Sequence, residues 1–238
     1  MIDGLLTGTH LLALAGITLG AAVQAATGMG FSLAAAPVLI LHLGPRDGVA
    51  VTLVLAMLAS VIPLLRDVRH ARPSAVAHLL VPTLLCTPLV ALALRGADTR
   101  WLALAAGTGI VVAVGILARG ARWPWLNRPA GAAATGAASA LLNVVGGVGG
   151  PPIGIYAANS GWSPETSRAN LLLFFLIQNL VTALVLSIVL PGLPELAALV
   201  LGTACGMLLS TRIPSRVLRA AVLGVSFAGG LGLLGGAF

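Results

Sequence analysis

Long apolar stretches alternate with short charged clusters along the whole chain. Eight stretches contain no Asp, Glu, Lys or Arg, and six of them have the length of a single helix. A hydrocarbon core about 30 Å thick is crossed by about 20 residues of helix, so the pattern predicts a succession of membrane-spanning helices. The charge-free stretches are residues 4–45, 48–65, 73–94, 101–118, 129–164, 169–194, 196–211 and 220–238.

The two longest stretches each contain a glycine-rich interruption. The first is TGMG at 27–30, and the second is GGVGGPP at 146–152. Glycine and proline end helices, so each stretch is predicted to form two segments. The second segments, 31–43 and 151–159, are too short to cross a bilayer comfortably. Each long stretch therefore predicts a helix followed by a half-helix.

The two halves of the chain match when the sequence is shifted by 119 positions. The matched pairs include Gln24 with Asn143, Gly28 with Gly147, Gly30 with Gly149, Ser60 with Asn179, and Arg100 with Arg219. We interpret this ungapped register as an internal duplication, with repeats at 1–119 and 120–238 in a single membrane domain. Each half has one broken pair and three full helices, an odd number of crossings. The second repeat is therefore predicted to be inverted.

Composition supports a membrane protein and excludes a soluble one. Hydrophobic residues make up 58% of the chain, charged residues make up 8%, and the mean hydropathy is +1.06. Soluble domains have about 25% charged residues. The net charge of +7 comes entirely from arginine. Because these arginines lie in short clusters rather than on one contiguous face, we expect no nucleic-acid binding.

The thirteen arginines also orient the chain. If loop 66–73 is cytoplasmic, the alternation of helices puts ten arginines on that side and leaves Arg46, Arg95 and Arg100 on the other. This asymmetry satisfies the positive-inside rule. We therefore predict a multi-pass protein of the bacterial cytoplasmic (inner) membrane, with both termini non-cytoplasmic.

The glycine breaks form the candidate binding site. Unpaired backbone groups are costly in hydrocarbon, so such breaks persist where they are buried in protein or line a polar cavity. The N-terminus of each half-helix would aim N–H groups and a positive dipole end at an anion. Polar side chains flank both breaks. The substrate-binding candidates are Gln24, Thr27, Gly28, Gly30, Phe31, Ser32, Asn143, Gly147, Gly149, Gly150, Pro151, Tyr156, Gln178 and Asn179.

Each of these features also has a purely structural interpretation. Small residues let helices pack closely, and buried amides form interhelical hydrogen bonds. Arg46 and Arg168 follow the half-helices, and would either attract an anion to the entrance or anchor a helix at the interface. His10 and His78 have no acidic partner deep in any apolar stretch, so we expect both to be peripheral.

Other motifs point away from catalysis. The sequence has no intramembrane carboxylate pair, no zinc motif and no phosphate loop, so it predicts no enzyme, cofactor or metal site. Gly202 and Gly206 have the GxxxG spacing and enclose Cys205. This spacing predicts close packing between two helices.

Two motifs around the breaks resemble those of a known family. Residues 27–37, TGMGFSLAAAP, with 44–50, GPRDGVA, resemble the first motif of the TauE/SafE sulfite-exporter family of membrane permeases. Residues 146–152, followed by Tyr156 and by SPETSRA at 163–169, resemble the second and more specific motif. The resemblance spans nearly the whole chain. It implies a secondary permease for small anions, often sulfur oxyanions or organosulfonates.

The sequence thus predicts an all-helical polytopic membrane protein that moves a small anion by alternating access. Coupling would be to protons, to another ion, or to the substrate's own gradient. An anion channel remains an alternative, as does a non-transporting membrane subunit or assembly factor. The identity of the anion, the direction of transport and a homo-oligomeric state also stay open.

Overall fold

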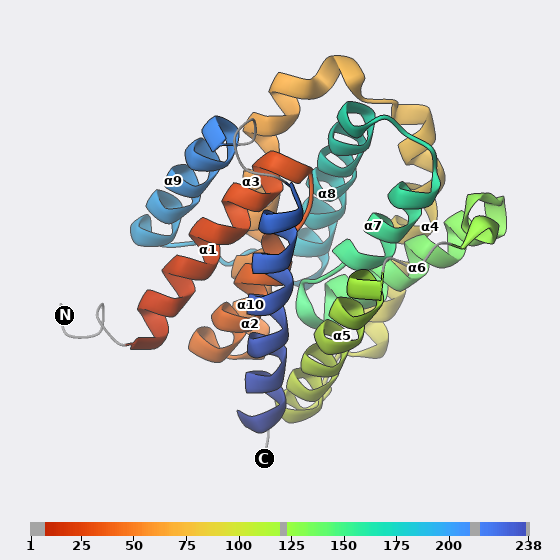
Figure 1. Ribbon diagram of the computed structural model, residues 1–238. Coiled ribbons are helices and arrows are strands. Elements are labelled where there is room, and N and C mark those ends of the chain that lie inside the picture. The colour runs from red at the N-terminus through yellow and green to blue at the C-terminus, as the bar shows by residue number, and fades with distance from the viewer. Residues whose placement is uncertain (1–7, 120–122, 210–214, 237–238) are drawn as a thin grey trace.

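The computed structural model describes residues 8–119, 123–209 and 215–236 (Figure 1). These ranges form α-helices and two short 3-10 turns, Val68–His70 and Pro124–Asn127, and contain no strand. The helices are α1 Gly8–Thr27, α2 Phe31–Leu43, α3 Pro45–Asp67, α4 Pro73–Ala93, α5 Thr99–Arg119, α6 Pro129–Gly146, α7 Gly150–Asn159, α8 Pro164–Leu186, α9 Leu193–Leu209 and α10 Ser215–Gly236.

The helix pattern confirms the predicted all-α membrane architecture. Among the described residues, α1, α3, α4, α5 and α8 are each long and apolar enough to cross a membrane. Helix α3 is the most deeply buried of these five. The charge-free stretches of the sequence coincide with the helices α1 to α10, because a helix in a membrane tolerates few charged side chains.

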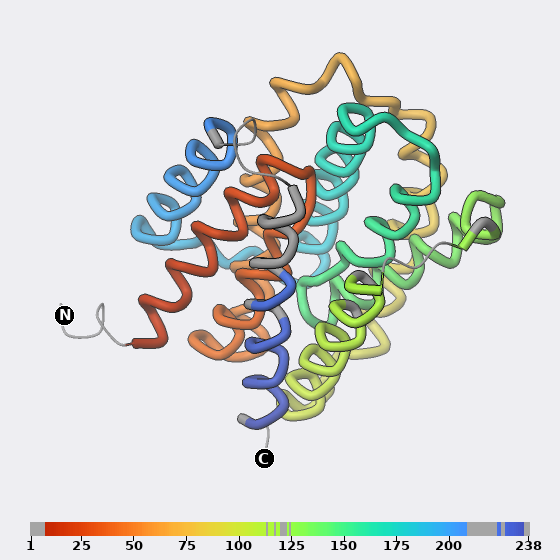
Figure 2. The backbone as a smooth tube through the Cα atoms, in the orientation of Figure 1, coloured from red at the N-terminus to blue at the C-terminus, as the bar shows by residue number. Residues whose placement is uncertain are grey.

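Each long apolar stretch is broken into a helix and a half-helix, as the sequence predicts. Helix α2 has 13 residues and α7 has 10, which corresponds to about 20 Å and about 15 Å of helix. Both are shorter than the hydrocarbon core. The smooth backbone in Figure 2 shows the chain turning sharply between α1 and α2 and between α6 and α7.

Matched glycines end the helix that precedes each break. Gly28 has φ 86° and Gly147 has φ 66°, both left-handed. The Gly28 N–H donates to Gln24 O at 2.8 Å, and the Gly147 N–H donates to Asn143 O at 2.9 Å. Glycine is the residue that adopts this conformation at little cost. The sequence therefore determines where each helix stops.

The helices of the two halves pack in a crossed pattern. Helix α1 packs against α9, α4 packs against α6, and α3 packs against α8. The 119-residue shift relates α1 to α6, α4 to α9 and α3 to α8, so the first two contacts are equivalent under it. A duplication would produce such a pattern, but the boundary between repeats at 119/120 stays a prediction. Arg122, Arg212 and both chain ends, which enter the predicted orientation, lie outside the described residues.

Small residues allow the close approach of α1 and α9. A Cβ placed on Gly202 or Gly206 would collide with the backbone of Thr18 or Ala22, respectively. The GxxxG spacing therefore serves helix packing, as predicted. Cys205 is exposed and lies beside this contact.

We expect Gly206→Ala to lower the free energy of unfolding by about 1–3 kcal/mol, because overpacking forces the helices apart. The matched control is Gly115→Ala on α5, where a Cβ would meet no atom within 4 Å. A thermal unfolding scan in detergent compares the two variants. Equal melting temperatures would contradict the packing role of Gly206.

Candidate functional site

The two helix breaks face one small shared cavity. Its volume is about 10 Å³, which is room for about one water molecule. The lining comes from α1, α2, α6, α7 and α8, together with the residues just before α2 and α7. All of its members except Leu33 and Phe175 were expected from the sequence. They are Gln24, Gly30, Ser32, Leu33, Asn143, Gly149, Gly150, Phe175 and Asn179.

In the first half of the chain, the Gln24 amide ties the break to α3. Its Nε2 donates to Ser60 Oγ at 2.8 Å and to Ala56 O at 3.1 Å. Its Oε1 accepts from the Phe31 N–H at 3.3 Å. The residue is 2% exposed. A buried amide is costly unless it is bonded, so these contacts hold α1, α2 and α3 in one arrangement.

In the second half, Asn143 makes the corresponding contacts. Its Nδ2 donates to Asn179 Oδ1 at 3.2 Å and to Thr182 Oγ1 at 3.1 Å. Its Oδ1 accepts from the Gly149 N–H at 3.2 Å. The 119-residue shift relates Asn143 to Gln24 and Asn179 to Ser60. The same amide clamp therefore holds both breaks.

These clamps change which backbone groups can meet a ligand. We expected the N–H groups around Gly30–Phe31 and Gly149–Gly150 to bind an anion, but those of Phe31 and Gly149 donate to the clamping amides. The first N–H groups of a helix have no acceptor within the helix. Among the described residues, no protein acceptor occurs for the N–H groups of Ser32 and Gly150. Both residues line the cavity, so these are the available backbone donors.

Ser139 and Gln178 fix the opposite side of the second break. Ser139 Oγ lies 2.7 Å from Gly149 O, to which it donates, and it accepts from Gln178 Nε2 at 2.9 Å. Both side chains are fully buried. Gln178 therefore positions Gly149 through Ser139 and does not line the cavity. The sequence analysis missed Ser139, although it precedes Asn143 by about one helical turn.

The remaining candidates lie around the cavity without lining it. Thr27 Oγ1 is 2.9 Å from Val23 O and 2.8 Å from Met29 O, so it stabilises the first break. Pro151 is buried in the first turn of α7. The ring of Tyr156 packs edge-on against Trp162, with 5.9 Å between their centroids.

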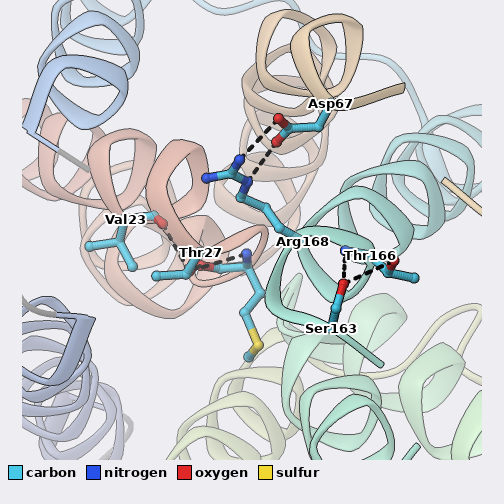
Figure 3. Close-up of polar contacts among 7 residues, drawn as sticks. Val23, Thr27, Asp67, Ser163, Thr166 and Arg168 are labelled. Carbon is cyan, nitrogen blue, oxygen red and sulfur yellow. Dashed lines mark hydrogen bonds and ion pairs between the residues drawn. The ribbon is translucent and has the colours of Figure 1, made fainter. Parts of the chain in front are cut away.

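The two candidate entrance arginines occupy different surroundings. Arg46 lines an open cleft of about 470 Å³ between the ends of α4, α6 and α8, and its Nη2 donates to Ala97 O at 3.3 Å. Arg168 instead forms an ion pair with Asp67 (Figure 3). The sequence analysis had not singled out Asp67. The side of the molecule with the cleft is called the Arg46 end, and the side with the ion pair is called the Arg168 end.

The family described as sulfite exporter TauE/SafE matches residues 12–233. The chain belongs to this family. No curated protein and no solved structure matches it. As a member of the sulfite exporter family with several apolar helices, the protein is a multi-pass membrane transporter. The resemblance inferred from the two glycine motifs is confirmed.

The two histidines considered in the sequence have different surroundings in this exporter-family member. His10 is 5% exposed, and its Nε2 lies 3.2 Å from Glu195 Oε1 at the start of α9. His10 also stacks on His42. The sequence pattern does not reveal this contact, because Glu195 is 185 residues away and lies between two apolar stretches rather than deep in one. His78 is exposed, and its Nδ1 lies 2.8 Å from Ser74 O, consistent with a peripheral position.

The cavity of this transporter has a lining of mixed polarity. The amides of Gln24, Asn143 and Asn179 are polar, while Leu33 and Phe175 are apolar. Within the described residues, its lining contains no charged side chain. Phe175 escaped the sequence analysis because an aromatic residue in a membrane helix is ordinarily assigned to packing. Its position four residues before Asn179 places both side chains on one helical face.

Proposed function

We propose that the protein is a secondary transporter of a small oxyanion, sulfite or an organosulfonate, and that the anion binds in the cavity between the two helix breaks. The observation that carries this proposal is the shared cavity itself, where two clamped breaks and three amide side chains converge. At membrane depth, irregular backbone of this kind persists where it is buried in protein or lines a polar cavity, and here it lines a cavity. The family is described as a sulfite exporter family, which supplies the substrate class.

The chemistry of the lining supports an anion. The N–H groups of Ser32 and Gly150 begin two half-helices, where the helix dipole favours negative charge. The amide of Asn179, whose Oδ1 accepts from Asn143, adds a neutral N–H donor. Within the described lining no carboxylate is present to repel an anion. Organic cations would find no countercharge there, so an oxyanion is the better fit.

The helix arrangement supports alternating access between inverted repeats. Helices α3 and α8 are antiparallel, because the end of α3 meets the start of α8 at the Asp67–Arg168 ion pair. At the other end, Val49 of α3 and Leu186 of α8 line the same cleft. The 119-residue shift relates α3 to α8. When two antiparallel repeats move relative to one another, each repeat can adopt the arrangement that the other had, which is the basis of alternating access.

The size of the cavity favours a carrier over a channel. A volume of about 10 Å³ holds about one water molecule, so a four-atom oxyanion enters when the surrounding helices move. A channel needs a continuous open path. We propose that the protein works in the bacterial inner membrane, with the Arg168 end cytoplasmic, as the arginine distribution predicts.

Counterflow in proteoliposomes distinguishes the candidate functions. With the purified chain alone, unlabelled external sulfite should accelerate the exit of labelled sulfite, and the effect should saturate. Flux that rises linearly with voltage and does not saturate would identify an anion channel. No flux from a folded, reconstituted chain would identify a non-transporting subunit and overturn the proposal.

A further inference from the structure

The ends of α3 and α8 are joined by a paired charge. Arg168 Nη2 donates to Asp67 Oδ1 at 2.9 Å, and Arg168 Nε lies 2.6 Å from Asp67 Oδ2. The Asp67 side chain is 8% exposed and that of Arg168 is 23% exposed. Figure 3 shows the Arg168 side chain reaching from α8 to Asp67, with Thr27 of α1 beside it. The ion pair thus combines one charge-assisted hydrogen bond, from Nη2, with a close contact between Nε and Oδ2 that is not itself a hydrogen bond.

The first helix break packs directly on the same residue. A Cβ placed on Gly28 would lie 2.7 Å from Arg168 O and 2.9 Å from Arg168 Cα. The end of α1 therefore lies against the backbone of α8, while the end of α3 is held by its side chain. The end of α1 and the end of α3 therefore both contact the start of α8 at the Arg168 end, close to the central cavity.

The matched positions at the Arg46 end are open. The 119-residue shift relates Asp67 to Leu186 and Arg168 to Val49, and both of these line the open cleft of about 470 Å³. A Cβ on Gly147, the match of Gly28, would meet only side-chain atoms, at 3.3 Å from Thr52 Cγ2 and 3.9 Å from Val49 Cγ1. The glycine thus packs on backbone atoms at the Arg168 end, but on side chains beside an open cleft at the Arg46 end. Cleft residue Val144 adjoins Asn143, which lines the central cavity.

We propose that the Asp67–Arg168 ion pair is the closed gate at the Arg168 end, and that the transported oxyanion opens it by replacing Asp67 on Arg168. The proposal rests on the proposed function. It adds Asp67 as a gate residue and Arg168 as a second anion-binding position.

Guanidinium chemistry makes this exchange favourable. The fork of Arg168 binds an oxyanion with the same two-point geometry as a carboxylate. A buried cation left without a partner is costly. Arg168 therefore leaves Asp67 readily only when an anion takes its place, which couples opening of this end to the arrival of substrate.

Thiol accessibility tests the gate without depending on transport. In a background with Cys86→Ser and Cys205→Ala, Ser32→Cys places a single thiol at the central cavity. In oriented vesicles, an impermeant thiol reagent added at the Arg168 end should label this thiol slowly. Asp67→Asn should raise that labelling rate about tenfold, because it removes the partner of a partly buried charge. Asp67→Glu, which keeps the carboxylate, should restore slow labelling.

Glu195→Gln provides the matched control. It also neutralises a carboxylate that joins two helices, but it acts at the contact with His10 between α1 and α9. It should leave labelling from the Arg168 end unchanged. The Asn170 contact, in which Oδ1 accepts from the Arg72 N–H at 2.7 Å, remains in all variants and helps retain the fold.

The exchange step has its own measurement. Methanesulfonate serves as the anion because sulfite consumes thiol reagents. It should speed labelling from the Arg168 end in the parent and have no effect in Arg168→Gln.

Unchanged labelling in Asp67→Asn would overturn the gate even with sulfite flux intact. If methanesulfonate changes the labelling rate of the parent and of Arg168→Gln equally, the proposed exchange on Arg168 is overturned. Faster labelling in Asp67→Asn with no sulfite flux by the parent would instead refute the proposed function and leave the ion pair as a gate.

Discussion

Replacing Gly149 with alanine should lower sulfite flux roughly tenfold to a hundredfold. The added Cβ would lie 2.8 Å from Gln178 Nε2, 2.9 Å from Ser139 O and 2.9 Å from Ser139 Oγ. These atoms belong to the buried support of the second break, so they cannot move aside independently. Gly149 has an ordinary φ of −65°, and the effect is therefore steric. Initial rates of labelled sulfite uptake into proteoliposomes measure it.

Gly150→Ala is the matched control at the next residue. Its Cβ would lie 3.8 Å from Phe175 Cζ, an ordinary van der Waals contact. Alanine keeps the Gly150 N–H that the proposed site uses, so most of the flux should remain, provided that both variants reconstitute to equal amounts. Equal flux in Gly149→Ala and the parent would contradict the role of the second break. A larger loss in Gly150→Ala than in Gly149→Ala would contradict the assigned geometry.

Asn143→Asp should abolish sulfite flux while the protein still folds. Aspartate has nearly the shape of asparagine and can still accept from the Gly149 N–H. It would, however, place a negative charge on a cavity that the structure leaves uncharged. Two like charges about 4 Å apart repel by about 4 kcal/mol at an effective dielectric constant near 20. That energy corresponds to about a thousandfold loss of binding.

Asn159→Asp tests whether the amide-to-acid change itself is harmful. Asn159 ends α7, and its Oδ1 accepts from the Trp123 N–H at 2.9 Å. Asn159 lies outside the cavity, so the sulfite flux of Asn159→Asp should stay near that of the parent. Gln24→Glu, which alters the clamp of the first half, should resemble Asn143→Asp. Unaltered uptake by Asn143→Asp at neutral pH would exclude an anion site beside this residue.

The sequence predicted the elements of this fold because local chemistry determines them. Charge-free stretches marked the helices, and glycine marked both breaks, since Gly28 and Gly147 adopt left-handed conformations. The amides Gln24 and Asn143 were recognised by their position one turn before each break. Their role in holding the backbone beyond each break was not predicted. A side-chain amide bonding to the backbone beyond the break depends on the path of the loop, which the sequence pattern does not contain.

The contacts between distant segments could not be predicted in this way. Asp67 and Arg168 are 101 residues apart, and His10 and Glu195 are 185 apart. Only packing of α3 on α8, and of α1 on α9, brings these groups together. The difference between the two ends was also hidden, because matched sequences occupy different environments in one conformation. The duplication in the sequence therefore indicates equivalent positions but not which end is closed.

Ligand-induced stabilisation tests most directly whether the anion binds between the two breaks. The apparent melting temperature of the purified protein is measured against increasing sulfite, with potassium chloride as the ionic-strength control. A ligand that binds the native state raises its stability by mass action. We predict a saturable rise in the parent and in Gly150→Ala, and none in Gly149→Ala or Asn143→Asp. An equal saturable rise in all four proteins would place the anion elsewhere and contradict the account.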